Sequence, residues 1–208
     1  MIGVCLLAGA ADAEAQKMRL GETLVMAPFE AAPPAATDAV VFQADRGARK
    51  GQYLVVTTRP AKGGSASEYR LLSPGTVGTL PDVDVLGIHY IKVRPERAAA
   101  FEQFVGRTLH PAVGNLRPDL RLLYYKAVTG PEAGNYIALF ALTRESRDKY
   151  WPGGSDSDDL RTALKPVQPL TKELSTYLVE GSALTDPKFA AAVFESLTWT
   201  DFVLVQPK

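Results

Sequence analysis

The chain has 208 residues, and 23 lysines and arginines balance 23 aspartates and glutamates, so its formal net charge is zero. Proteins that hold a nucleic-acid backbone need clustered excess positive charge, which makes nucleic acid an unexpected partner. One cysteine excludes an internal disulfide, and two histidines leave little for a metal centre, so we predict no metal site. Apolar residues make up 46%, as in globular proteins, but no apolar run reaches the roughly 20 residues of a membrane span.

The first fifteen residues have two interpretations. Residues 2–10 are apolar and are followed by small-residue triplets at 11–13 and 13–15, as in a secretory signal. However, no basic residue precedes the apolar stretch, and the first one is Lys17. We favour a buried β-strand over residues 2–10, with a signal remnant or a start inside a longer exported precursor as alternatives. The compartment stays open: cytoplasmic for the strand, periplasmic for an exported chain.

An internal repeat organises the predicted elements. Residues 40–56 align without a gap with residues 123–139, and Gly51 falls on Gly134 at an offset of 134 − 51 = 83. Each copy has two β-rich runs around a loop that is bounded by two glycines, which is typical of a β-hairpin.

The first copy is expected to cover residues 1–74 and to be the degenerate half. The same offset predicts a strand over 2–10 and a helix over 13–30, in which Pro28 matches Pro111. Residues 60–67 are too short and glycine-rich for a second helix. Residues 67–74 read as the last strand, and residues 75–84 form a linker rich in glycine and proline.

The second copy is expected to cover residues 85–208. A strand over 85–93 ends at Arg94-Pro95, and apolar residues then recur at helical spacing until His110-Pro111, a bend or the helix end. Residues 200–207 resemble residues 67–74, the last strand of the first copy, at an offset of 207 − 74 = 133. This offset exceeds that of the hairpins by 133 − 83 = 50, so the second copy has 50 additional residues before its last strand. The further elements are a hairpin over 121–128 and 135–143, a mostly helical insertion over 146–196 with Ser155 or Ser157 as a cap, and a closing strand over 199–205.

The order β-α-β-β-α-β is that of a ferredoxin-like unit. Residues 87–105, GIHYIKVRPERAAAFEQFV, run from a strand through a Val-x-Pro corner into an amphipathic helix. This stretch resembles the opening of antibiotic-biosynthesis-monooxygenase-like, NIPSNAP-like and polyketide-cyclase-like domains of the dimeric α/β-barrel superfamily. The resemblance implies an α+β fold in which two ferredoxin-like repeats pair within the chain to form an intrachain dimeric α/β-barrel.

The same resemblance implies a small-molecule pocket between sheet and helices, lined partly by the first strand of the second copy. His89 alternates with Val85 and Ile91 on one face of that strand, and an imidazole suits a general base near neutral pH. The candidate catalytic residues are His89 with Tyr124 or Tyr125 as an orienting hydroxyl donor. Further candidates for the pocket are Tyr90, His110, Tyr136, Tyr150 and Trp151.

Two classes of function stay open. The first is an enzyme: a cofactor-free or haem-linked monooxygenase, with His89 as the base or an axial haem ligand, or a cyclase-type proton-transfer enzyme. The second is a non-catalytic ligand-binding or structural barrel in which His89 is a packed core residue. In both classes the expected partner is a small molecule, neither nucleic acid nor membrane, and the chain is a monomeric pseudo-dimer or a homodimer.

Overall fold

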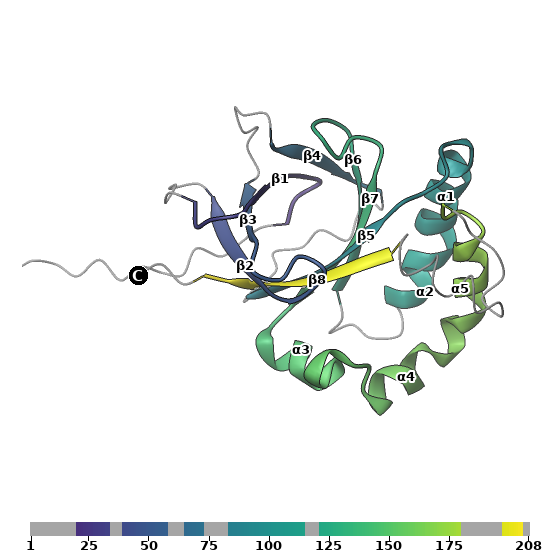
Figure 1. The fold of residues 1–208 in the computed structure, drawn as a ribbon. Helices are drawn as coiled ribbons and strands as arrows, with labels where there is room; N and C mark the ends of the chain where they lie inside the picture. Colours follow the sequence, from purple (N-terminus) through teal and green to yellow (C-terminus); the bar gives the residue numbers. More distant parts are fainter. Residues whose placement is uncertain are drawn as a thin grey trace, which may run out of the picture.

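The structure, a computed structural model, describes residues 20–33, 39–57, 65–72, 83–114, 121–179 and 197–205. Eight antiparallel strands close into a barrel, and the described helices lie outside it on one side (Figure 1). The order around the barrel is β1-β3-β2-β8-β5-β7-β6-β4. The strands are β1 (Thr23–Phe29), β2 (Val40–Gly47), β3 (Tyr53–Thr57), β4 (Ser67–Leu71), β5 (Val85–Ile91), β6 (Arg121–Ala127), β7 (Tyr136–Leu142) and β8 (Leu197–Leu204).

The barrel interior is the main hydrophobic core. Successive side chains of a strand point to opposite faces, so alternate residues of all eight strands face the interior. Phe42, Leu86, Ile88, Tyr125 and Phe202 are among the fully buried members of this core. Each such side chain contributes about 1.5–3 kcal/mol of transfer free energy. The same alternation turns the intervening residues of β5 outward, toward the helices.

Both predicted hairpins are confirmed, with the same backbone conformation at their glycines. Gly47 is the last residue of β2 and Gly51 follows this strand, with φ of 91° each, and Gly130 and Gly134 follow β6 with φ of 81° and 89°. Positive φ is accessible to glycine without a steric penalty, which is why the two loops need glycine there.

The hydrogen bonds of the two hairpins also correspond. The N–H of Ala44 donates to the Gln52 carbonyl, and the N–H of Ala127 donates to the Asn135 carbonyl, both at 2.8 Å. The residue numbers of the two donors differ by 127 − 44 = 83, and those of the two acceptors also differ by 135 − 52 = 83. The two loops therefore have one geometry in two parts of the chain.

The prediction for the beginning of the chain is partly wrong. Residues 2–10 lie outside the described residues, so the strand expected there stays a prediction. Thr23–Phe29, within the expected helix 13–30, is instead strand β1, which pairs with β3 and β4. Pro28 thus lies in a strand and is not the equivalent of Pro111 in a helix. Pairing on both sides satisfies the backbone of this segment and overrides its weak helical pattern.

A first helical run crosses the outer face of β5, β6 and β7. It comprises a 3-10 turn (Pro95–Arg97), α1 (Ala98–Phe104), a π-helical turn (Val105–Leu109) and α2 (His110–Gly114). Of the two alternatives predicted for His110-Pro111, a bend or the helix end, the helix end is wrong, because the helical run continues to Gly114. The N–H of His110 donates to the Val105 carbonyl five residues back, and this wider turn accommodates Pro111, which has no N–H to donate.

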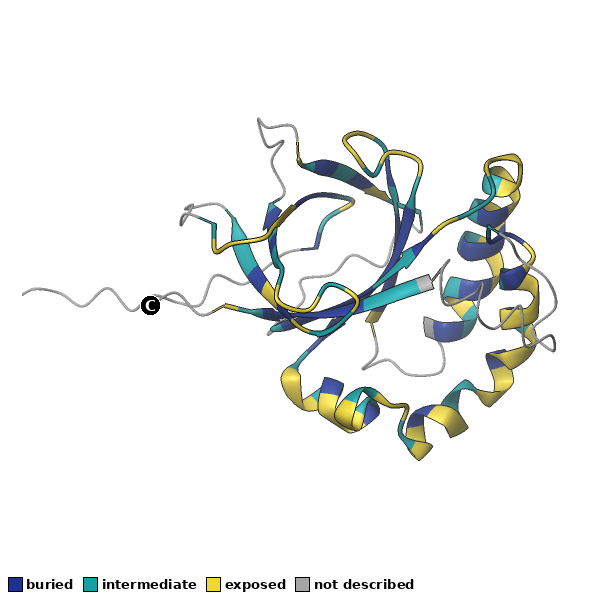
Figure 2. Ribbon diagram, in the orientation of Figure 1, coloured by how far each residue is buried: buried dark blue, intermediate teal, exposed yellow. Residues whose placement is uncertain are grey.

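A second helical run follows β7 and curves under the barrel toward α1 and α2 (Figure 1). It contains α3 (Arg144–Tyr150), α4 (Asp158–Leu164) and α5 (Gln168–Ser175). Ser157 caps α4, as one of the two predicted alternatives, because its hydroxyl accepts from the N–H of Leu160 at 3.1 Å. The buried side of these helices faces the sheet (Figure 2). No described helix is long and apolar enough to cross a membrane.

Candidate functional site

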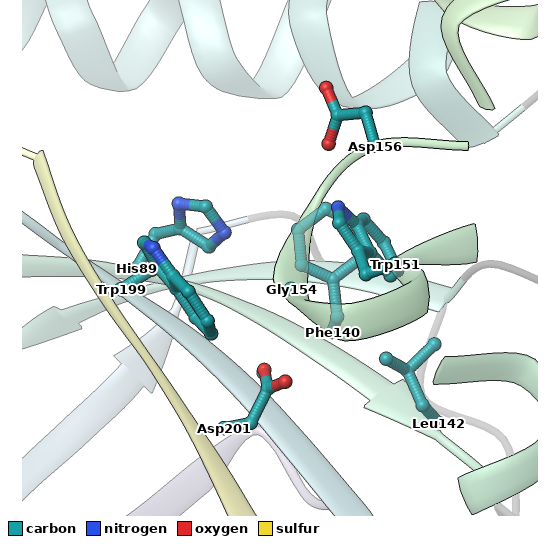
Figure 3. A pocket seen from close by; sticks show the side chains of 9 residues that line it. His89, Phe140, Leu142, Trp151, Gly154, Asp156, Trp199 and Asp201 are labelled. Atoms are coloured by element: carbon teal, nitrogen blue, oxygen red, sulfur yellow. The ribbon is translucent and has the colours of Figure 1, made fainter. Parts of the chain in front are cut away.

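A cavity of about 120 Å³ lies on the outer face of the barrel, between the sheet and the segment that follows α3 (Figure 3). Three adjacent strands, β8, β5 and β7, form its floor. The residues that line it are Gly87 and His89 of β5, Phe140 and Leu142 of β7, Trp199 and Asp201 of β8, and Trp151, Gly154 and Asp156 after α3.

Strand register brings the polar groups of this cavity together. His89 is paired with Trp199 and Gly87 with Asp201, so His89 and Asp201 are diagonal neighbours on one sheet face. Such neighbours lie roughly 7–8 Å apart. A Cβ at Gly87 would lie 3.3 Å from Oδ1 of Asp201, so the absence of a side chain there leaves room for the carboxylate. Figure 3 shows the imidazole and the carboxylate projecting into the space between the aromatic rings.

Aromatic rings make the cavity wall apolar. The rings of His89 and Phe140 meet edge to face with centroids 5.7 Å apart, and those of Phe140 and Trp151 do so at 5.3 Å. Trp199 closes the wall on the β8 side. Such a wall favours a ligand with a flat or ring-shaped body.

His89 is neutral at physiological pH. Desolvation by the surrounding side chains lowers its pKa to about 4, and the negative charge of Asp156 opposes this effect only partly. No described residue forms a hydrogen bond with the imidazole. A neutral imidazole has one N–H donor and one acceptor nitrogen, and within the described part of the chain neither has a partner that would compete with a ligand.

Asp201 is the second titratable group of the cavity. It is 7% exposed, and burial raises its pKa to about 6, against the opposing positive charge of Arg147. Asp45 and Asp148 add to the upward shift. The described residues provide no hydrogen-bond partner for this carboxylate, which therefore ionises close to neutral pH while it faces the cavity.

A cluster of charged residues holds α3 against the barrel beneath this site. The buried guanidinium of Arg147 donates to Asp45 of β2 at 2.7 Å and to Asp148 at 3.0 Å. Arg46 donates to Asp148 at 3.1 Å and to the carbonyl of Trp151 at 3.0 Å. This cluster attaches the segment carrying Trp151 to β2 and so positions one wall of the cavity.

Of the residues singled out from the sequence, His89 and Trp151 line this cavity. Tyr124 faces outward beneath the helices, with its ring 6.4 Å from that of His110. Tyr125 faces the barrel interior and donates to the carbonyl of Gly21 at 3.1 Å. Consecutive strand residues point to opposite faces, so these two tyrosines cannot share one pocket.

The other candidates lie in different places. Tyr90 and Tyr136 line a second cavity at the hairpin end of the barrel, and His110 lines an open groove beside α1. Tyr150 is fully buried under the second helical run, with its ring 6.2 Å from that of Trp151.

Asp201 and Trp199 were not singled out from the sequence. The signal that points to Asp201 is a single carboxylate within the apolar closing strand, TWTDFVLV. An acidic residue buried in a strand needs a partner or a function.

Neither a metal ion nor haem fits this site. Among the described residues, no three histidine, cysteine, aspartate or glutamate side chains gather around a common point. A cavity of about 120 Å³ is below the roughly 300–1,000 Å³ of sites for drug-sized ligands, and haem is larger than those ligands. Asp156 and Asp201 would also repel the propionates of haem, and no lining residue is cationic. We therefore derive no chemistry through haem.

No protein-family model matches the sequence, and no curated protein matches it in sequence. The solved structures that are similar in fold include the following two. The haem-degrading enzyme of Listeria monocytogenes is 15% identical, with 87% of this chain and 98% of that chain covered at a TM-score of 0.47. A candidate monooxygenase of Lactobacillus acidophilus is 9% identical, with 88% and 92% covered at a TM-score of 0.38. At the level of architecture, the closed barrel with outer helices is the α/β-barrel that the sequence resemblance implied.

Proposed function

We propose that this protein is an enzyme that moves a proton to or from a small carbonyl compound. Asp201 would be the general base, and neutral His89 would donate a hydrogen bond to the carbonyl oxygen. One observation carries the proposal: two titratable groups without hydrogen-bond partners among the described residues face one aromatic cavity, with pKa values displaced in opposite directions.

The two pKa values support this division of roles. A general base is most effective when its pKa lies near the working pH, and the pKa of Asp201 is raised to about 6. Its carboxylate is therefore mostly ionised at pH 7 and more basic than an ordinary aspartate. The pKa of His89 is lowered to about 4, which makes it a weaker base than the sequence suggests but keeps its N–H neutral.

The proposed reaction needs no cofactor. A ligand with its ring between Phe140 and Trp151 would present a C–H group next to its carbonyl to Asp201. The proton passes from carbon to the carboxylate oxygen, and the electron pair of the C–H bond moves toward the carbonyl oxygen. The N–H of His89 stabilises the resulting enolate oxygen, with greater effect between aromatic rings than in bulk water. Return of the proton to another atom completes an isomerisation. In a ligand with a second carbonyl, attack of the enolate carbon on that carbonyl carbon forms the ring, and its oxygen then takes the proton from Asp201.

We also infer that the barrel consists of two ferredoxin-like repeats, residues 1–74 and 85–208, joined by the linker 75–84. The circular order divides into β4-β1-β3-β2 and β8-β5-β7-β6, two sheets with the same internal order joined by the pairs β2·β8 and β4·β6. The equivalent hairpin hydrogen bonds support this division. The second repeat, with its insertion over 146–196, would then supply all residues that line the cavity.

The proposal is tested by hydrogen–deuterium exchange of small ketones. We would incubate the protein with cyclohexanone or acetophenone in D₂O and follow the loss of the α-proton by NMR. Exchange should exceed the buffer rate and rise with pH through an apparent pKa of about 6, as Asp201 ionises. Replacing the base, Asp201→Asn, should lower the rate by about 10²-fold or more. His89→Gln should also lower it.

Tyr124→Phe provides the control, because this tyrosine is buried in the same half of the barrel but does not line the cavity. Its exchange rate should equal that of the wild type. Equal rates in Asp201→Asn and wild type would refute the assigned base. Ketone binding without exchange would instead favour the non-catalytic ligand-binding barrel.

A further inference from the structure

A second cavity, of about 380 Å³, opens at the end of the barrel where the two hairpins meet. Its volume lies within the roughly 300–1,000 Å³ of small-molecule sites. Ile91 and Ile137 are its apolar lining residues. The polar and charged groups around it come from both halves of the barrel: Arg49, Tyr69, Tyr90, Lys92, Glu132 and Asn135.

The two hairpins present opposite charges at equivalent positions of this cavity. The residue numbers of Arg49 and Glu132 differ by the repeat offset, 132 − 49 = 83. Nη2 of Arg49 lies 3.6 Å from Oε1 of Glu132. Each backbone is anchored in the same way, with the N–H of Arg49 donating to the Thr200 hydroxyl at 3.2 Å and that of Glu132 to the Ser67 hydroxyl at 3.1 Å. These two hydrogen bonds hold the loops that bring the ion pair to the cavity.

Two tyrosine hydroxyls at the cavity lack partners. Tyr69 is 2% exposed, and neither its hydroxyl nor that of Tyr90 forms a hydrogen bond with any described residue. Burial raises the pKa of Tyr90 to about 12 and that of Tyr69 further, so both groups are neutral donors. Both residues line the cavity, so a ligand oxygen there can accept a hydrogen bond from each hydroxyl.

The balance of charge and donors points to an anion. Arg49 and Lys92 contribute two positive charges against the single negative charge of Glu132. The Glu132 carboxylate is already engaged, because it pairs with Arg49 and accepts from the amide of Asn135 at 2.9 Å. The guanidinium of Arg49 lies over the ring of Tyr90, 3.9 Å from its centroid, which holds this positive charge at the cavity.

We propose that this second cavity binds a small organic carboxylate, held by the guanidinium of Arg49 and the hydroxyls of Tyr69 and Tyr90. The net single positive charge matches a monoanion, and the apolar surface matches a hydrophobic body. A carboxylate would compete with Glu132 for Arg49, since both offer the same planar pair of oxygens. This site is separate from the cavity of His89 and does not depend on the proposed reaction.

The test is calorimetric titration of the full chain with benzoate, and with benzamide as the uncharged counterpart. Benzoate should bind and benzamide should bind more weakly. Tyr69→Phe and Tyr90→Phe each remove one hydroxyl without changing the ring, and each should weaken benzoate binding about tenfold. Glu132→Gln removes the competing carboxylate and should tighten binding about two- to fivefold, the equivalent of a partly exposed ion pair.

Tyr53→Phe is the matched control, because Tyr53 lies on β3 and does not line the cavity. It should leave benzoate binding unchanged. Absence of binding at millimolar benzoate, equal affinity for benzamide, or unchanged affinity in Tyr69→Phe and Tyr90→Phe would each overturn the proposal. Binding that is lost in His89→Phe but kept in Tyr69→Phe would place benzoate in the other cavity and overturn it as well.

Discussion

Replacing Asp201 with asparagine should stabilise the fold at neutral pH, although it removes the proposed base. The folded structure raises the pKa of this carboxyl from 3.8 to about 6. A difference of 6 − 3.8 = 2.2 units, at about 1.4 kcal/mol per unit, corresponds to about 3 kcal/mol of unfavourable ionisation. The asparagine side chain carries no charge at any pH, so the free energy of unfolding of the variant should exceed that of the wild type by up to this amount.

The gain must depend on pH in one direction. The folded pKa lies above the unfolded value, so the folded state holds the proton more tightly. The penalty is absent below the unfolded pKa of 3.8, grows as pH rises, and is complete above about pH 6. Wild type and Asp201→Asn should therefore be equally stable near the unfolded pKa, and the variant should be more stable above pH 6. The titration of His89 is common to both proteins and cancels in the difference.

Denaturant unfolding of both proteins across this pH range measures the effect. For a protein of this size, 1 kcal/mol shifts the melting temperature by roughly 2–4 °C, so the full gain corresponds to about 6–12 °C. Asp148→Asn is the control with the opposite sign, because Arg147 lowers the pKa of the exposed Asp148 and its loss should not stabilise the protein. A gain for Asp201→Asn that does not vary with pH would refute the reasoning.

Two further predictions concern glycines. Gly87→Ala would place a Cβ 3.3 Å from Oδ1 of Asp201, so ketone exchange should fall by NMR while the melting temperature changes little; unaltered exchange would contradict the assigned cavity. Gly130→Ala and Gly134→Ala both impose positive φ on alanine, but only at Gly130 would the Cβ collide with the backbone of Ala66. Gly130→Ala should therefore lower the free energy of unfolding, measured with denaturant, by about 1–3 kcal/mol more than Gly134→Ala does. Equal losses in the two variants would exclude the collision as a cause.

The elements that could be predicted from the sequence are those determined by local interactions. The paired glycines specify both hairpins because each loop needs positive φ at the same spacing. Ser157 and the aspartates after it specify the start of α4 through capping. Strand β1 could not be predicted in this way, because Thr23–Phe29 is extended only through its pairing with β3 and β4.

The candidate site likewise combines features that local sequence predicts with features that depend on strand pairing. Alternation along β5 is a local property, so the sequence alone was sufficient to place His89 on one face together with Val85 and Ile91. The partner of His89 depends on register: β8 follows β5 by more than a hundred residues, and only their pairing sets Asp201 opposite Gly87. Burial in that pairing then displaces both pKa values. The sequence thus determined the residue types and their local geometry, whereas tertiary structure decided which of them share a cavity, because strand pairing and desolvation depend on distant parts of the chain.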